Sequence, residues 1–416
     1  MRRKTSNLER YMFFFGRLYP LNFAFKLTVS ECLEEARIKD ALTRLSRRHP
    51  IIFAHQEYTE GKKMDMVFPD EPPLPVSHIA EESEWQRILL GCMAKEFKPL
   101  EGPFFTLDYR YTENHTELFF TFQHGASDGI AAVYVISDFL KIYQEMEIAI
   151  PDVPVMPVLY DVLLAEVDEE MKKRPEPGWK SEPPPAGHPF EMPPHKVSDY
   201  FLRTYELSRE GTAHLGAEAK KNGQTVHSWL GALILKASAD IFGKEGMERT
   251  IQCPVDFRQY IQEEYRTLAG VHNGIVKVKV DCALELPAAA QRIKEGIQES
   301  RTGYKDIEEY YQWRDSFDSV PDPESLMMDF TVDPVDFDFS FSNLGRTAIL
   351  EDYRGLKVLD FYGPIFTAVN GETVIGVNTT NGELKMSIIF DKNIPKAPGY
   401  RALAGQIREI LHSFES

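Results

Sequence analysis

Residues 118–129 read Leu-Phe-Phe-Thr-Phe-Gln-His-Gly-Ala-Ser-Asp-Gly, an apolar run followed by a short polar segment. The apolar run predicts a buried strand, and the spacing of apolar residues from Ile130 to Met146 predicts a helix. The polar segment therefore lies where a strand ends and a helix begins. A histidine held at the end of a strand can act as a general base, because imidazole titrates near neutral pH. We therefore interpret His124 as the candidate catalytic residue.

Asp128 comes four residues after this histidine, at the predicted start of the helix. A carboxylate is favoured there by the helix dipole and by the free backbone amides of the first turn. Gly125 and Gly129 allow the backbone to turn tightly between the two elements. The spacing alone carries little information, because His195 and Asp199 repeat it without a helix behind them. The alternative interpretation is a core histidine beside a helix cap.

The length of 416 residues exceeds what one hydrophobic core supports, so we expect two large lobes. Eleven of the 27 prolines fall between residues 151 and 195, and such a density prevents long regular structure. We place an N-terminal lobe at residues 1–175, a proline-rich connector at 176–199 and a C-terminal lobe at 200–416.

Helices and strands are predicted on both sides of the connector, which indicates a mixed α/β (α+β) fold. Thr225 is expected to cap the helix that it begins. The predicted helices cover 31–48, 85–97, 130–146, 211–222, 225–242 and 400–414. The predicted strands cover 51–55, 104–111, 117–123, 200–207, 274–280, 335–341, 373–378 and 384–390, and a turn is expected at Gly61-Lys62.

The chain carries 47 basic and 64 acidic side chains, a formal charge of −17, which disfavours nucleic acid as a partner. A CoA nucleotide could bind only through a local basic patch, and the doublet Lys220-Lys221 is interpreted instead as a solvated face. The four cysteines form no metal-ligand pattern, so no metal is expected. Neither an export signal nor a membrane span is predicted, which favours a cytoplasmic protein.

Beyond these patterns, the sequence resembles the CoA-dependent acyltransferase superfamily, which includes chloramphenicol acetyltransferase, condensation domains of nonribosomal peptide synthetases, alcohol acetyltransferases and polyketide-associated acyltransferases. The resemblance covers nearly the whole chain. Besides the segment 124–129, it is carried by five stretches: Leu42–Pro50, Phe97–Pro103, Cys253–Arg258, Val271–Ile275 and Ser342–Gly345.

The resemblance implies two chloramphenicol-acetyltransferase-like lobes, each a mixed sheet flanked by helices, with a tunnel between them. It implies that His124 takes the proton from a hydroxyl or amine acceptor as that group attacks an acyl thioester. Asp128 would turn away from the substrate and pair with an arginine, for which Arg258 is the candidate. Ser342 and Asn343, or the backbone amide of Gly129, would contact the oxyanion or the substrate, although a plain turn role for Ser342 and Asn343 is equally open.

The expected activity is therefore acyl transfer of the alcohol acetyltransferase type, with acyl-CoA or an acyl carrier thioester as co-substrate and no permanently bound cofactor. A small alcohol or amine is the expected acceptor, an acyl carrier protein is an alternative partner, and a monomer is expected. Two other functions stay open: a non-catalytic condensation-like module that binds a thioester-loaded carrier, and a thioester hydrolase.

Overall fold

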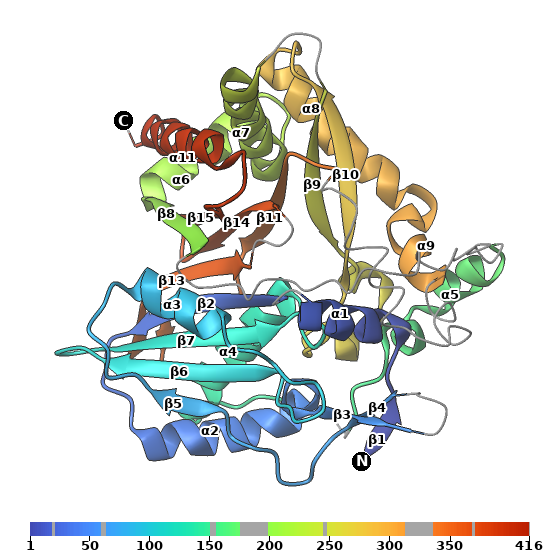
Figure 1. The fold of residues 1–416 in the computed structure, drawn as a ribbon, viewed down its shortest axis with the longest axis vertical. Helices are drawn as coiled ribbons and strands as arrows, with labels where there is room; N and C mark the ends of the chain where they lie inside the picture. The colour runs from blue at the N-terminus through green and yellow to red at the C-terminus, as the bar shows by residue number, and fades with distance from the viewer. Residues whose placement is uncertain are drawn as a thin grey trace.

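The computed structural model describes residues 1–18, 21–59, 64–149, 155–174, 199–243, 248–312, 336–367 and 371–415. Two six-stranded mixed sheets organise it, one in each of two lobes (Figure 1). This arrangement confirms the predicted α/β fold with two lobes. The Gly61-Lys62 turn and nearly all of the connector at 176–199 lie outside the described residues.

The N-terminal lobe is built on the sheet with strand order β12-β13-β2-β7-β6-β5. Its central strands β2 and β7 are buried along their whole length, because this sheet is covered on both faces. The strands are β2 (Asn22–Val29), β5 (Val76–His78), β6 (Phe105–Tyr111), β7 (Thr116–Gln123), β12 (Asp352–Tyr353) and β13 (Leu356–Phe366). The helices are α1 (Asn7–Leu18), α2 (Glu35–Arg48), α3 (Trp85–Met93) and α4 (Gly129–Tyr143), and a small sheet joins β1 (Arg2–Lys4), β3 (His55–Tyr58) and β4 (Met64–Val67). Helix α5 (Ala165–Lys172), which falls within the predicted N-terminal lobe, instead packs Val167 and Met171 into the core of the C-terminal lobe, beside α9 (Lys305–Gln312) (Figure 1).

The C-terminal lobe is built on the sheet with strand order β10-β9-β11-β14-β15-β8. The predicted cap is present, since the Thr225 hydroxyl accepts a hydrogen bond from the Ser228 N–H at the start of α7. The strands are β8 (Tyr200–Leu207), β9 (Glu248–Asp256), β10 (Asn273–Asp281), β11 (Phe339–Arg346), β14 (Thr373–Thr380) and β15 (Glu383–Asp391). The helices are α6 (Arg209–Lys221), α7 (Val226–Phe242), α8 (Leu286–Arg301), α9 (Lys305–Gln312) and α11 (Ala397–His412).

The two sheets are joined by strand β13, which comes late in the chain but belongs to the N-terminal sheet (Figure 1). It pairs with β2 in antiparallel register, Phe361 opposite Leu27. At its far end it approaches β14 so closely that a Cβ on Gly376 would lie 1.9 Å from the Pro364 carbonyl oxygen. The predicted C-terminal lobe ran without interruption from 200 to 416. In the structure, residues 352–366 instead belong to the N-terminal sheet.

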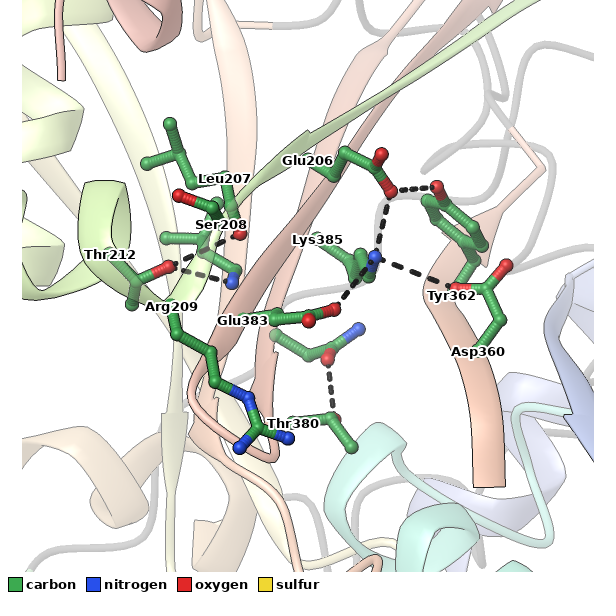
Figure 2. Close-up of polar contacts among 12 residues, drawn as sticks. Glu206, Leu207, Ser208, Arg209, Thr212, Asp360, Tyr362, Thr380, Glu383 and Lys385 are labelled. Carbon is green, nitrogen blue, oxygen red and sulfur yellow. Dashed lines mark hydrogen bonds and ion pairs between the residues drawn. The ribbon is translucent and has the colours of Figure 1, made fainter. Parts of the chain in front are cut away.

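A cluster of charged side chains lies between β13 and the C-terminal sheet (Figure 2). Lys385 on β15 lies 2.7 Å from a Glu206 carboxylate oxygen, 3.2 Å from Glu383 and 3.6 Å from Asp360 of β13. The Tyr362 hydroxyl donates a hydrogen bond to Glu206. The lobes are therefore linked by electrostatic contacts as well as by the exchanged strand.

The segment after α2 differs from the predicted strand at 51–55. It forms a 3-10 helix over Pro50–Phe53, and β3 begins only at His55. The fixed φ of Pro50 suits the first turn of a helix. Ile51, Ile52 and Phe53 are all buried, so the segment lacks the alternating exposure of a surface strand.

Among the helices within the described ranges, none combines the length and the apolar character needed to cross a bilayer.

Candidate active site between the two lobes

His124 follows the last residue of β7 and lies against two phenylalanine rings. Its ring centroid is 5.2 Å from that of Phe23 on β2 and 5.7 Å from that of Phe366 at the end of β13. Burial lowers the pKa of His124 below its usual value, although its own carbonyl and Asp128 act in the opposite direction. Nδ1 is buried without a hydrogen bond of normal geometry within the described residues. The imidazole is thus held neutral near physiological pH, as a general base requires.

The loop that carries this histidine is fixed from the preceding position. Gln123 accepts a hydrogen bond from the Gly125 N–H through Oε1, at 2.5 Å, and its Nε2 donates to the Met12 carbonyl of α1 at 3.3 Å. A Cβ on Gly125 would lie 2.8 Å from Gln123 Oε1, so a side chain there would force the amide to move. Gln123 was not predicted from the sequence, because a glutamine that binds neighbouring backbone leaves no spacing pattern.

Asp128 caps α4, and its carboxylate is turned away from His124. Oδ1 accepts a hydrogen bond from the Ala131 N–H at 2.9 Å, and Oδ2 accepts one from the His272 N–H at 2.7 Å. Arg258 Nη2 lies 3.1 Å from both oxygens, so the expected ion pair is present. Burial opposes ionisation of Asp128, but the Arg258 charge and the two amides outweigh burial and lower its pKa.

Arg258 also contacts Asp256 at 2.8 Å and the Arg266 carbonyl at 2.9 Å. The loop after β9 is anchored further along, where the Ala269 N–H donates to Nδ1 of the buried His49 at 3.0 Å. His49 Nε2 in turn lies 3.2 Å from Asp138 of α4. The sequence indicated none of these roles for Asp256 and His49, although both residues stand inside segments that carry the resemblance.

Ser342 and Asn343 lie near the end of β11. The following residue, Leu344, packs close to the first residue of α4, since a Cβ on Gly129 would lie 3.0 Å from Leu344 Cδ2. Asn343 Oδ1 accepts the Gly345 N–H at 2.8 Å, so the turn uses this oxygen. The Ser342 hydroxyl has no hydrogen-bond partner among the described residues, and both residues line the cavity.

A cavity of about 1930 Å³ lies between the lobes, and residues of both lobes line it. The N-terminal lobe contributes His124, Tyr11 and Met12 of α1, and Ile130 of α4. The volume exceeds that of a typical single-ligand pocket, so two substrates can be held together.

A second imidazole, that of His227 at the start of α7, also lines the cavity. Its Nε2 is 3.3 Å from Cys253 Sγ, and burial lowers its pKa to about 4. Within the described residues, no group of three or more His, Cys, Asp or Glu side chains is arranged to hold a metal ion.

No family model and no curated protein sequence matches the chain. Solved structures do match it along nearly their whole length. Polyketide synthase associated protein 5 from Mycobacterium tuberculosis is similar with a TM-score of 0.66 at 14% identity, covering 99% of this chain and 98% of its own. Trichothecene 15-O-acetyltransferase from Fusarium sporotrichioides is similar with a TM-score of 0.70 at 11% identity, covering 99% and 95%.

The first condensation domain of the CDA synthetase is similar with a TM-score of 0.68 at 13% identity, covering 100% of this chain and 96% of its own. At identities this low, the structural similarity establishes the fold alone. The activity must be argued from the residues of the site. The chain therefore has the two-lobed fold shared by condensation domains and acyltransferases of the CoA-dependent type.

Proposed function

We propose that the protein transfers an acyl group from a CoA thioester to a hydroxyl or amine, with His124 as the general base. The observation that carries the proposal is the position of His124: a neutral imidazole in a cavity lined by both lobes. Its Asp128 neighbour is already committed to Arg258 and so is unavailable as a competing base.

In the proposed reaction, the imidazole accepts the proton of the acceptor O–H or N–H while that atom attacks the thioester carbonyl carbon. The C–S bond then breaks, and the imidazolium returns its proton to the departing thiolate. The products are an ester or amide and free CoA thiol. Such base catalysis supplies about 10² to 10⁴ in rate, and alignment of the two substrates adds to it.

The oxyanion of the tetrahedral intermediate requires a hydrogen-bond donor. The Ser342 hydroxyl is our first candidate, because Ser342 lines the cavity and its hydroxyl forms no hydrogen bond with any of the described residues. The Asn343 side-chain amide and the Gly129 N–H are the alternatives.

Charge in the cavity favours a CoA donor. Four basic residues that line it form no ion pair with a carboxylate among the described residues: Lys220, Lys294, Arg301 and Arg346. By contrast, lining carboxylates are paired with cations, Asp128 and Asp256 with Arg258 and Asp336 with Lys277. In a chain of formal charge −17, such a local excess of positive charge matches the phosphates of a nucleotide.

The test is to mix the protein with acetyl-CoA and longer acyl-CoAs, add an alcohol and amine panel, and follow thiol release and product. We expect His124→Ala to lose at least about 10²-fold in rate. His412→Ala, a change on an exposed position of α11, should retain the wild-type rate. Equal rates in wild type and His124→Ala would overturn the proposal. Free acid as the product would identify a hydrolase, and turnover only with a carrier-bound thioester would replace CoA as donor.

A further inference from the structure

The C-terminal sheet has two chemically different faces, and one of them lines the cavity. On β9, Ile251 and Cys253 belong to the hydrophobic core, whereas Gln252 and Pro254 line the cavity. On β10, Val278 packs against Gly296 of α8 while Lys277 lines the cavity. Because successive strand residues point to opposite faces, the first group marks a helix-covered face and the second an uncovered face.

A row of polar side chains crosses the uncovered face. Gln252 is in register with Lys277 of β10 and with Ser340 of β11, and its Nε2 donates to Ser340 Oγ at 3.4 Å. Ser342 follows on the same face of β11. The three uncharged members are more than nine-tenths buried, with 7% of Gln252, 5% of Ser340 and 4% of Ser342 exposed.

This row has unused hydrogen-bonding capacity. Within the described residues, Gln252 Oε1 accepts no hydrogen bond and the Ser342 hydroxyl has no partner, yet neither atom is sealed from the cavity. Buried polar atoms are normally satisfied, so these are left for a ligand or for water. Lys277 at the end of the row is neutralised by Asp336 at 2.6 Å, so the row offers hydrogen bonds without a free charge.

Of the four cavity cations without an ion pair among the described residues, three come from helices and the fourth, Arg346, is the last residue of β11. Lys220 belongs to α6, and Lys294 and Arg301 belong to α8, which packs on the helix-covered face. A phosphate-bearing donor is therefore attracted toward these helices and the far end of β11, which leaves the part of the uncovered face around Gln252 and Ser340 for the second substrate.

We propose that Gln252 and Ser340 bind the acyl acceptor, with Ser342 beside them for the oxyanion, and that this acceptor carries an amide beside its hydroxyl or amine. This inference rests on the proposed function, because only acyl transfer makes the second substrate an acyl acceptor. The Gln252 carboxamide offers an N–H donor and a C=O acceptor in one plane. An amide of the ligand can pair with both, its C=O accepting from the N–H and its N–H donating to the C=O. A hydrocarbon alcohol would leave the buried polar row unpaired, and a site built for hydrogen bonds discriminates strongly against such an analogue.

The test compares N-acetylethanolamine with 1-hexanol, which have the same number of non-hydrogen atoms and one hydroxyl each but differ in the amide. Acyl-transfer kinetics and saturation-transfer NMR are measured on wild type, Gln252→Leu and Gln298→Leu. Gln298 is the matched control, because it lines the same cavity from α8. We expect wild type to prefer N-acetylethanolamine at least about tenfold in kcat/KM, and Gln252→Leu alone to lose that preference through KM.

The outcomes separate the two proposals. Equal use of the two acceptors by wild type, or an unchanged preference in Gln252→Leu, overturns the acceptor row while acyl transfer stands. Binding of N-acetylethanolamine that depends on Gln252, in a protein that transfers no acyl group, overturns the proposed function while the row stands as an amide-binding site. Failure of wild type to bind N-acetylethanolamine at millimolar concentration, with CoA or without it, overturns the row.

Discussion

Arg258 Nη2 lies equidistant from the two carboxylate oxygens of Asp128, at 3.1 Å from each, and this contact ties the start of α4 to the loop after β9. Only 5% of Arg258 and 2% of Asp128 are exposed. Since His124 stands four residues before Asp128 on the same loop, the ion pair that connects the lobes also positions the candidate base.

Asp128→Asn should destabilise the protein by about 3 to 5 kcal/mol, because it leaves a buried guanidinium without its main partner. Urea unfolding measures this loss. Asp256→Asn is the control, since its side chain is 35% exposed and its loss leaves the Asp128 contact in place. Adding Arg258→Met to Asp128→Asn should recover part of the loss, and a double variant less stable than either single one would contradict the argument.

Gly129→Ala should leave stability within about 1 kcal/mol of wild type yet reduce acyl transfer. The new Cβ lies 3.0 Å from Leu344 Cδ2, the far end of a flexible side chain, and alanine gains about 0.5 to 1 kcal/mol of helix propensity over glycine. Moving Leu344 shifts the end of β11, which holds Ser342 at the cavity wall. Such a misplacement can lower kcat/KM by up to about 10²-fold.

The control for this change is Gly91→Ala on α3, where no atom lies within 4 Å of the new Cβ. It should not alter the kinetics. If Gly129→Ala instead unfolded the protein, Leu344 would be more rigidly held than we infer.

Local signals predicted those parts of the fold that depend on neighbouring residues. Strand β8 and the Thr225 cap of α7 were both predictable, because alternation and capping act over a few positions. The exchange of β13 was not, since its pairing with β2 joins residues more than 300 positions apart and leaves no local pattern.

The candidate site shows the same division. His124 and Asp128 were found from their strand-to-helix setting, and Arg258 only through the resemblance. Phe366, Gln123 and His272 approach the site through tertiary packing or backbone contacts, which no spacing encodes. Lys220 was interpreted as part of a solvated face, and its place on the cavity wall could be recognised only once α6 was positioned.

The rate of acyl transfer should rise with pH along an acid limb whose midpoint lies below the ordinary imidazole pKa of about 6.5. Burial lowers the pKa of His124, and only the neutral imidazole can accept the proton of the acceptor. Measuring kcat/KM from about pH 5 to 8 tests this expectation. A midpoint above 6.5 would mean that the ring is charged more easily than its surroundings imply.

Stability should fall as the pH drops from about 6.5 toward 4. Burial lowers the pKa of His227 to about 4 and that of His272, aided by the Arg258 charge, to about 3. In this window the unfolded chain binds protons that the folded protein excludes, so unfolding is favoured by acid. In His227→Gln the unfolding free energy should depend less steeply on pH, whereas His412→Gln, an exposed change, should keep the wild-type slope. Identical slopes in all three proteins would contradict the assignment.

Lys385→Met should loosen the joint between the lobes, because it leaves Glu206 and Glu383 without the cation that they share with Asp360 (Figure 2). Asp360 keeps its ion pair with Lys26 at 3.0 Å. The Lys385 side chain is only 9% exposed, whereas its partners are more accessible, so we expect a loss of about 1 to 2 kcal/mol, less than for a fully buried pair.

The repulsion among these carboxylates should be screened by salt, so the difference between Lys385→Met and wild type should shrink as ionic strength rises toward about 1 M. Lys39→Met removes an exposed pair with Glu35 on α2 and should cost less than about 0.5 kcal/mol. Thermal unfolding of the three proteins in low and high salt distinguishes these cases. A salt-independent loss in Lys385→Met would assign the role of Lys385 to the cation–π contact of its Nζ with the Tyr362 ring, 5.3 Å from the ring centroid, instead of to its ion pairs.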